Sequence, residues 1–374
     1  HLARELRRKP RDIATEIAEG LELPSYVAQV KVEGAGYLNL FLDRGAIGAQ
    51  LLTEPVVSPG EGHTDKAIVE HTNINPNKAA HIGHLRNAVL GDTLVRCLRA
   101  LDRTVEIQNY IDDTGVQVAD VVVGILYLPE DELAAALGVE ISRRDELIEE
   151  VLERLPVGEV PAASTTDFDD LCWEVYPKVT ARYEADPDFS QRRAQVLHAI
   201  EEGPAQVDLE QATYLLRGAV LAGEDFPVHA VARLAAEVAA GNVGCHLATM
   251  ARLAVTYDVM PHESDILHLG FWQRAFELLR DAGAIRLETE GKNEGCWVMS
   301  LASSPEFAKM DDPDKILVRS NGTVTYTGKD IAYQLWKLGL LTESNGSLHD
   351  FGYAAFAHWR QPGPAQPLEY GDSG

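Results

Sequence analysis

The chain has few cysteines and no long apolar run. Its four cysteines (Cys97, Cys172, Cys245 and Cys296) are far apart among 374 residues, and none forms a C-x-x-C pair. This spacing argues against a zinc knuckle and against a disulfide framework, and it favours a reducing cytosol. No apolar stretch approaches the roughly 18 to 20 residues of a membrane span. The charged first residues lack the apolar core of a signal peptide. We therefore expect a cytoplasmic protein without a membrane segment.

Basic residues are also scarce. The chain has 33 lysines and arginines against 58 aspartates and glutamates, a formal net charge of −25. Such a charge argues against a protein that coats itself in nucleic acid. One basic cluster stands out at the N-terminus, formed by Arg4, Arg7, Arg8, Lys9 and Arg11. It can be a solvated helix face or a local nucleic-acid contact, and the residues alone leave both open.

The length suggests two or three domains. Residues 1–62 have the pattern of a small α+β unit: a helix that opens at Pro10 and is ended by Pro24, then two strands around a glycine turn at 34–36. Residues 58–62, rich in glycine and proline, are an expected linker. After it, strand 67–70, a helix beginning at His81 and strand 105–111 form a βαβ unit, which implies a parallel sheet.

The pattern changes from about residue 126. Acidic amphipathic helices dominate up to about 315, with clear examples at 145–155 and 168–184, and we interpret this region as a large, mostly helical insertion. Strand character returns at 315–319 and 324–326 around an Asn-Gly turn. Asp330 is expected to open the next helix.

The turn before residue 84 has the pattern of a nucleotide site. His81 and His84 are three residues apart, so they share one helix face. Gly83 leaves room for a flat group such as a nucleobase, and Lys78 adds a cation to a helix start that attracts anions. A single helical histidine is more often an ordinary surface or core residue. The position at the strand-to-helix turn of a βαβ unit favours a bound nucleoside triphosphate instead.

Residues 70–92 resemble the signature region of the class I aminoacyl-tRNA synthetases, specifically of the arginyl-tRNA synthetases. His81-Ile82-Gly83-His84 matches the HIGH motif of that class in order and context. The resemblance continues, in the family's order, at 109–117, 262–265 and 318–333. Residues 204–244 do not fit the family pattern.

The resemblance implies an α/β fold. Its parts are a Rossmann-like parallel sheet (the class I synthetase catalytic fold), a large mostly helical insertion and a small N-terminal α+β domain. We expect an N-terminal tRNA-contacting domain, a first catalytic half, the insertion and the start of a second catalytic half, at 1–62, 63–125, 126–315 and 316–374.

The resemblance also implies a role for each site residue. Glu70, Tyr326 and Asp330 would bind the side chain of L-arginine, whose planar guanidinium suits carboxylates, and Asn75 would hold its backbone end. Asp330 could instead be a helix N-cap, and Asn75 a plain turn residue. The ATP-binding residues would be His81, Gly83 and His84, with Mg²⁺ on the phosphates and no metal site on the protein. Catalysis would fall to His81, His84 and Lys78.

The family's second motif, a KMSKS-type loop, is missing. Residues 309–312 imitate it poorly, and Lys78 occupies the place of a lysine that replaces it in some arginyl enzymes. Arg7, Arg8, Lys9 and Arg11 would contact tRNA(Arg). The expected function is ATP-dependent activation of L-arginine and its ligation to tRNA(Arg), by a monomer.

Two rival hypotheses remain open at this stage. The chain begins with histidine and ends at Gly374, before the remaining parts of the family's fold, so we expect a partial chain whose own activity is in doubt. One rival is a synthetase-derived module that binds tRNA or a protein without catalysis. The other is a nucleotidyl transferase of the HIGH type with a different acceptor.

Overall fold

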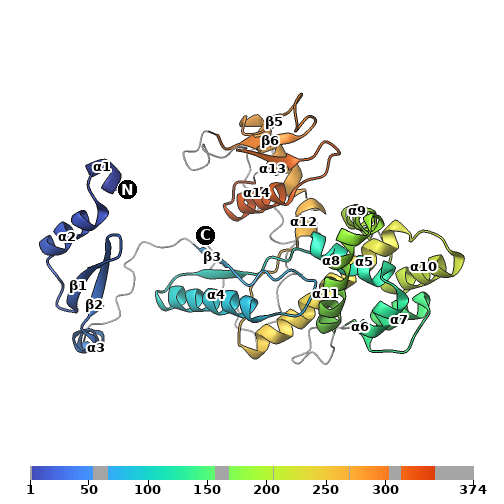
Figure 1. Cartoon of the computed structure of the whole chain (residues 1–374), viewed down its shortest axis with the longest axis horizontal. Coiled ribbons are helices and arrows are strands. Elements are labelled where there is room, and N and C mark those ends of the chain that lie inside the picture. The colour runs from blue at the N-terminus through green and yellow to red at the C-terminus, as the bar shows by residue number, and fades with distance from the viewer. Residues whose placement is uncertain are drawn as a thin grey trace, which may run out of the picture. The chain divides into compact units, whose positions relative to one another are not determined.

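The structure is a computed structural model that describes residues 2–53, 66–155, 168–204, 206–268, 270–302 and 313–341. Two compact units can be distinguished (Figure 1). The first holds residues 2–53 with Ala100–Arg103, and the second holds the other described residues. The expected linker at 58–62 and the segment 309–312 lie outside the described residues.

The first unit is a small α+β structure, as predicted. It contains α1 (Leu2–Leu6), α2 (Pro10–Gly20), β1 (Val27–Glu33), β2 (Tyr37–Leu42) and α3 (Arg44–Thr53). The two strands pair antiparallel, with Val32 opposite Leu38. Gly36 has a φ of +125°, and a Cβ there would lie 2.8 Å from the carbonyl of Pro10, so the turn closes against the start of α2. Only glycine fits this approach.

The second unit begins with the predicted βαβ element. Strand β3 (Ala67–Glu70) and β4 (Val105–Gln108) pair parallel, and α4 (Ile82–Ala100) connects them. The predicted strand 105–111 is too long, because β4 ends at Gln108. Beyond it the backbone N–H of Tyr110 donates to Asn73 Oδ1 instead of to a strand.

A third segment continues the parallel arrangement. Val259 and His262 form isolated parallel bridges with Gln108 and Ile111. These residues belong to the stretch that the sequence assigned to the helical insertion. Residues 259–262 therefore lie beside the βαβ element, although they are about 150 residues away from it in sequence.

Seven helices lie between β4 and this segment among the described residues. They are α5 (Val116–Tyr127), α6 (Glu130–Leu137), α7 (Arg144–Glu153), α8 (Phe168–Ala185), α9 (Pro187–Glu202), α10 (Leu209–Ala222) and α11 (Val228–Arg252). The helices predicted at 145–155 and 168–184 are confirmed as α7 and α8. Helix α5 is buried on every side from Val118 to Leu126, as expected for the centre of a helical core.

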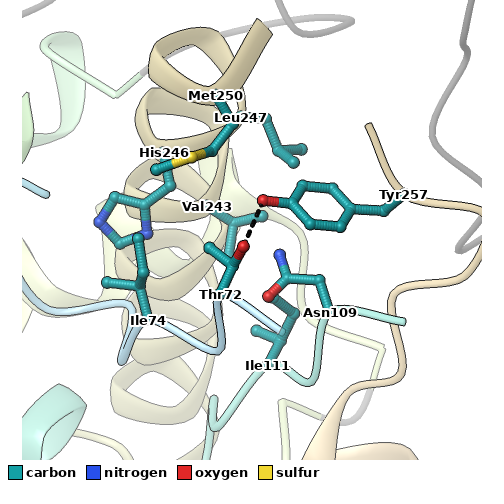
Figure 2. A pocket seen from close by; sticks show the side chains of 9 residues that line it. All are labelled: Thr72, Ile74, Asn109, Ile111, Val243, His246, Leu247, Met250 and Tyr257. Atoms are coloured by element: carbon teal, nitrogen blue, oxygen red, sulfur yellow. Dashed lines mark hydrogen bonds between the residues drawn. The ribbon is translucent and has the colours of Figure 1, made fainter. Parts of the chain in front are cut away.

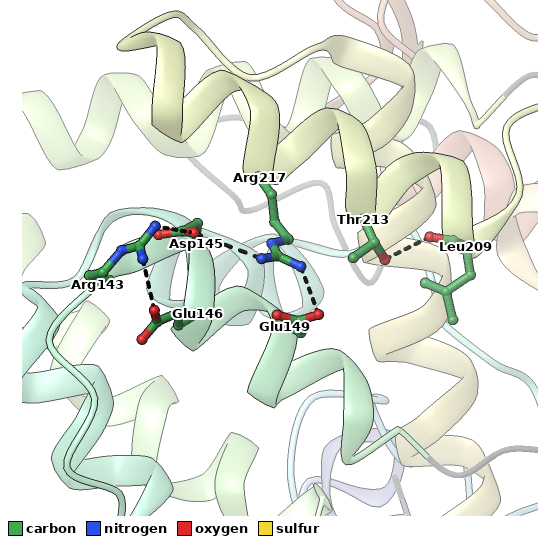
Figure 3. Close-up of polar contacts among 7 residues, drawn as sticks. All are labelled: Arg143, Asp145, Glu146, Glu149, Leu209, Thr213 and Arg217. Atoms are coloured by element: carbon green, nitrogen blue, oxygen red, sulfur yellow. Dashed lines mark hydrogen bonds and ion pairs between the residues drawn. The ribbon is translucent and has the colours of Figure 1, made fainter.

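Ion pairs join α7 to α10 (Figure 3). Arg217 of α10 pairs with Glu149 at 2.7 Å and with Asp145 at 3.8 Å. Arg143 also pairs with Asp145, at 2.8 Å. Asp145 is 3% exposed and lies in the first turn of α7, where the helix dipole favours a negative charge. Two cations and a helix terminus thus compensate this buried carboxylate.

The second unit has two apolar cores, and α11 contributes to both. Its Leu234 and Val238 pack with the helices α5 to α10, whereas its Leu247 and Met250 pack with the βαβ element and the C-terminal helices. This 25-residue helix therefore links the helical region to the parallel strands.

The described part of the chain ends with a small sheet and three helices. These are α12 (Glu263–His268), α13 (Phe271–Asp281), β5 (Arg286–Leu287), β6 (Trp297–Ser300), β7 (Asp314–Val318) and α14 (Tyr326–Lys337). The three strands pair antiparallel in the order β5-β6-β7. The strand predicted at 315–319 is confirmed as β7.

Two predictions about the last helix are wrong. Residues 324–326 do not form a strand, because only Val324 bridges to Val318 and Tyr326 already begins α14. Thr325 is the N-cap: its side chain accepts from the N–H of Gly328 and donates to the carbonyl of Ile316 at 2.8 Å. Asp330 lies in the second turn, so it does not cap the helix.

The predicted fold class is confirmed. The protein is a helix-rich α/β structure with a parallel strand pair and a small N-terminal α+β part. The carboxyl ends of β3 and β4, where parallel sheets bind ligands, lie at Glu70 and Gln108.

Candidate active site

The turn after β3 has an unusual backbone. Thr72 and Asn73 both have a positive φ, 74° and 45°. For a β-branched residue such as threonine this conformation is an outlier, and strain of this kind clusters at functional sites. The hydroxyl of Thr72 is fixed by the hydroxyl of Tyr257 at 2.7 Å (Figure 2).

Asn73 ties the ends of the two parallel strands together. Its N–H donates to Asn109 Oδ1 at 2.9 Å, and its Oδ1 accepts from the N–H of Tyr110 at 2.9 Å. Its Nδ2 donates to Glu70 Oε1 at 2.5 Å. One side chain thereby fixes both the carboxylate of Glu70 and the start of the segment after β4.

One small pocket lies behind this turn (Figure 2). Its lining is mostly apolar and comes from α11 and from the segments after β3 and β4: Thr72, Ile74, Asn109, Ile111, Val243, His246, Leu247, Met250 and Tyr257.

One face of α14 is directed at the strand ends. Tyr326, Asp330, Tyr333 and Lys337 follow one another at spacings of four, three and four residues, so they share this face. The hydroxyl of Tyr333 donates to Gln108 Oε1 at 2.5 Å. The ammonium of Lys337 pairs with Glu70 Oε2 and lies 4.1 Å from the centroid of the Tyr333 ring.

Glu70 is linked to the face of α14 that bears Asp330, because Lys337 of that face pairs with Glu70. Burial, and then the charges of Glu263 and Glu70, raise the pKa of Asp330 above its usual value. Two carboxylates from opposite ends of the sequence thus share one region, which favours binding of a cation. Tyr326 lies one turn before Asp330 and is 74% exposed. Asn75 is half-buried in the turn after β3, and its carbonyl accepts from the N–H of Asn77 at 2.8 Å.

A buried ionic network supports this region. Lys329 Nζ donates to Glu263 Oε2 at 2.7 Å and to Thr114 Oγ1 at 2.9 Å. Burial, together with Glu263, raises the pKa of Asp112 to about 7. Among the described residues, the buried hydroxyl of Tyr110 and Oδ1 of Asp112 have no hydrogen-bond partner. A polar ligand with several donors could satisfy acceptors of this kind.

The two histidines lie at the start of α4. The carbonyl of His81 accepts the N–H of Leu85 at 3.1 Å, which places His81 at the N-cap position. The rings of His81 and His84 stack with centroids 3.7 Å apart. Nδ1 of His81 accepts from the N–H of Gly83 at 3.1 Å, and Nδ1 of His84 accepts from the N–H of His81 at 3.2 Å.

The charges of His81 and Lys78 both act on the ring of His84. Burial, and then the charges of His81 and Lys78, lower the pKa of His84 to about 4. His84 is therefore neutral at pH 7 and can keep accepting the N–H of His81. A Cβ on Gly83 would lie 3.0 Å from the His81 ring, so this glycine is also needed for the ring's position.

Lys78 lies three residues before His81, in the segment that leads into α4. Its Nζ donates to Asn77 Oδ1 at 3.1 Å and lies 5.0 Å from the centroid of the Tyr176 ring. Burial lowers the pKa of Lys78. Lys78 and His81 thus lie just before α4 and His84 lies in its first turn, and their role as an anion site stays a prediction.

The predicted tRNA contacts belong to the first unit. Arg7, Arg8, Lys9 and Arg11 are all exposed. Arg8 pairs with Glu16 at 2.6 Å, and Arg11 donates to the carbonyl of Gly34 at 3.4 Å. Two of the four side chains therefore have intramolecular partners.

Sequence reasoning missed several residues of the site. Lys337 was not singled out, and neither were Asn73, Glu263 and Lys329, although these three lie in blocks that carried the family resemblance. The four-residue spacing of Lys337 from Tyr333 could have placed it on the face of Asp330. The pairing of Lys337 with Glu70 joins residues 267 positions apart, and no local pattern predicts it.

Some further properties concern the described residues as a whole. None of their helices is both long and apolar enough to cross a membrane. They contain no group of three histidine, cysteine, aspartate or glutamate side chains suited to a metal ion. Cys97 is exposed, and Cys172, Cys245 and Cys296 are buried thiols.

Two family models match the chain. Residues 1–42 match the arginyl-tRNA synthetase N-terminal domain, and residues 47–142 match the catalytic domain of class I tRNA synthetases of the arginine type. The second match contains β3, the turn, α4 and β4.

Similar proteins cover nearly all of the chain. The arginine–tRNA ligase of Thermococcus sibiricus is 35% identical over 348 residues, which are 90% of this chain and 47% of that protein. The arginine–tRNA ligase of Deinococcus radiodurans is 32% identical over 88% of this chain and 44% of its own length. The solved arginyl-tRNA synthetase of Thermus thermophilus is 31% identical, with a TM-score of 0.49, over 91% of this chain and 47% of that one. The chain spans about half the length of these relatives.

Proposed function

The chain belongs to the arginyl-tRNA synthetase family, and from this we propose that it forms the N-terminal and part of the catalytic region of an enzyme that activates L-arginine with ATP and transfers it to tRNA(Arg). The observation that carries the proposal is the ion pair between Lys337 and Glu70, which holds the face of α14 that bears Asp330 against the end of β3. The neighbouring helix start carries Lys78, His81 and His84.

We propose that the carboxylates bind the guanidinium of arginine. A guanidinium is planar and always charged, and it forms its strongest contacts with carboxylates in a fork. Asn73 already fixes one oxygen of Glu70, so the carboxylate is preorganised. Tyr326 would contact the side chain from the first turn of α14, and Asn75 would hold the backbone end of the amino acid.

ATP would lie across the start of α4. The dipole of a helix start favours the triphosphate, and Lys78, His81 and His84 would stabilise charge that moves to the leaving pyrophosphate. Gly83 would admit the ribose or adenine. The carboxylate of arginine attacks the α-phosphorus directly, so the protein supplies positioning and electrostatics and no nucleophile. Mg²⁺ would be held by phosphate oxygens, its preferred ligands.

We also propose tRNA as a partner and the cytosol as the compartment. The basic residues Arg7, Arg8, Lys9 and Arg11 would contact the tRNA backbone through charge. The four thiols fit the reducing cytosol, where translation enzymes of this family would act.

Arginine-dependent exchange of pyrophosphate into ATP tests the proposal. The assay uses the natural full-length protein that carries this chain, with tRNA present. We expect exchange with arginine and none with lysine. Asp330→Asn should lower kcat/KM for arginine on the order of 10²-fold. Asp330 is exposed in the free protein, and losing one member of a charge contact that the bound substrate buries costs about 2–5 kcal/mol.

A matched control distinguishes this effect from a general loss of charge. Asp281→Asn removes a carboxylate that is paired at the surface with Arg280, and it should leave the exchange unchanged. Folded wild-type protein without arginine-dependent exchange would contradict the enzymatic proposal and would favour a non-catalytic binding module. If Asp330→Asn lowered kcat/KM for ATP as much as kcat/KM for arginine, the role assigned to Asp330 in arginine binding would be contradicted.

A further inference from the structure

Two helices of the helical region hold the segment that leads into α4. The N–H of Ala79 donates to the carbonyl of Asp169, at the start of α8, at 3.0 Å. The ring Nε2 of His246, on α11, lies 2.7 Å from the carbonyl of Lys78. Main-chain atoms on both sides of the Lys78 peptide group are thereby fixed from outside the βαβ element.

Side chains of α8 contact the same segment. The ring of Tyr176 lies 5.0 Å from the ammonium of Lys78, and the ring of Trp173 meets the ring of His81 edge-on at 6.1 Å. Asp169, Trp173 and Tyr176 are separated by four and three residues, so they share one face of α8. This face covers the residues that we propose for the phosphates.

The charge state of His246 matches its contact. His246 is 4% exposed, and burial lowers its pKa to about 4. At neutral pH the ring is uncharged, and its Nε2–H donates to the carbonyl of Lys78. The anchor therefore adds no positive charge that would compete with Lys78 for phosphate.

The side chain of Lys78 is also held without an opposing charge. Its ammonium contacts an amide oxygen, Asn77 Oδ1, and the face of an aromatic ring. Both groups attract a cation without neutralising it, whereas a carboxylate would cancel the charge that a phosphate needs. Burial of the ammonium strengthens its attraction for an incoming anion.

We propose that Tyr176 is a positioning residue for Lys78, and that its helix α8 makes the helical region part of the ATP site. The inference rests on the proposed function, because it takes Lys78 as a phosphate contact. The ring of Tyr176 orients the ammonium of Lys78 before ATP binds.

Paired substitutions at Tyr176 test the kinetic consequence. In the full-length protein, Tyr176→Phe keeps the ring and Tyr176→Leu removes it. We expect Tyr176→Leu to lower kcat of arginine-dependent pyrophosphate exchange about tenfold, the size of one cation–π contact in a partly desolvated site. The KM for arginine should not change, and Tyr176→Phe should restore kcat to within about twofold of wild type.

Two controls make the result specific. Tyr214→Leu removes a tyrosine from the surface of α10 and should keep full activity. In a Lys78→Met background, Tyr176→Leu should have no further effect, since the ammonium that it positions is gone. Unchanged kcat in Tyr176→Leu, or an equal loss in the Lys78→Met background, would overturn the proposal.

A spectroscopic measurement tests the geometry without using activity. In protein labelled with [ε-¹³C]lysine, the ring current of Tyr176 should shift the Lys78 signal upfield, with assignment by Lys78→Arg. The shift should persist in Tyr176→Phe and vanish in Tyr176→Leu. A Lys78 signal that is the same in all three proteins would overturn the proposal even if the wild type showed no exchange. Inactive wild type with the expected shifts would instead contradict only the proposed function.

Discussion

Lys337 puts a positive charge on the carboxylate that we propose for the substrate. Its ammonium pairs with Glu70, and its side chain is 9% exposed, while Asn73 occupies the other oxygen of Glu70. An arginine side chain that approaches Glu70 must therefore share or displace this resident cation.

Removing that cation should strengthen arginine binding. In Lys337→Met the carboxylates of Glu70 and Asp330 lose a competing positive charge, and we expect the KM for arginine to fall severalfold while kcat changes less. Lys315→Met, which removes an exposed lysine from β7, should leave both constants unchanged. Steady-state pyrophosphate exchange at varied arginine measures both. A higher KM in Lys337→Met would show that Lys337 orients Glu70 and does not compete with the substrate.

Helix α14 carries a buried anchor next to its substrate face. Lys329 is 8% exposed and pairs with Glu263, the first residue of α12, which is 3% exposed. Thr114, between β4 and α5, joins the same contact. Three segments are thus fixed to each other one residue away from Asp330, so the position of Asp330 depends on this anchor.

Removing only Lys329 from the ion pair should lower the free energy of unfolding more than replacing both Lys329 and Glu263. Lys329→Met leaves the charge of Glu263 buried and unpaired, and losses of this kind are about 3–5 kcal/mol. The double variant Lys329→Met with Glu263→Gln should regain more than half of that loss. Denaturant unfolding followed by circular dichroism measures the difference, with Lys315→Met as an exposed control. A double variant less stable than Lys329→Met would contradict this account.

Elements with strong local patterns could be predicted from the sequence, and their ends could not. The βαβ order and helices α7 and α8 follow from periodicity that depends only on neighbouring residues. The start of α14 at Tyr326 depends on Thr325, whose hydroxyl also bonds to the carbonyl of Ile316 in β7. The early end of β4 depends on Asn73, 37 residues before Tyr110. Tertiary contacts of this type are invisible to a local pattern.

The site divides in the same way. His81, Gly83 and His84 are adjacent in sequence, so a motif reveals them. The residues that position the segment before α4 come from α8 and α11. His246 of α11, for example, contacts the carbonyl of Lys78 although the two are 168 positions apart. Lys337 reaches Glu70 across 267 positions. Family resemblance found the residues that were assigned to substrate, but the residues that hold them in place required the structure.

At the scale of the whole molecule, charge is distributed unevenly. The chain has a formal net charge of −25, yet residues 1–53 have seven basic and seven acidic side chains and are neutral overall. The acidic excess therefore lies in the rest of the chain, which repels nucleic-acid phosphates. Of the four residues proposed to contact tRNA, the exposed Arg7 and Lys9 are then the most suitable phosphate contacts, because Arg8 and Arg11 already have partners within the unit.

The double variant Arg7→Ala with Lys9→Ala tests this distribution. Each lost phosphate contact should reduce the slope of log K against log salt by about 0.7–0.9, so the two together reduce it by roughly 1.5. Affinity for tRNA(Arg) should fall most at low salt, because counterion release contributes most to binding there. Filter binding between 50 and 200 mM salt measures both, a range over which several phosphate contacts change affinity by about 10³-fold or more. Arg44→Ala removes a basic residue of α3 outside the cluster and should keep the wild-type slope. An unchanged slope in the double variant would place the tRNA contacts elsewhere, on a surface that must overcome the acidic charge of the larger unit.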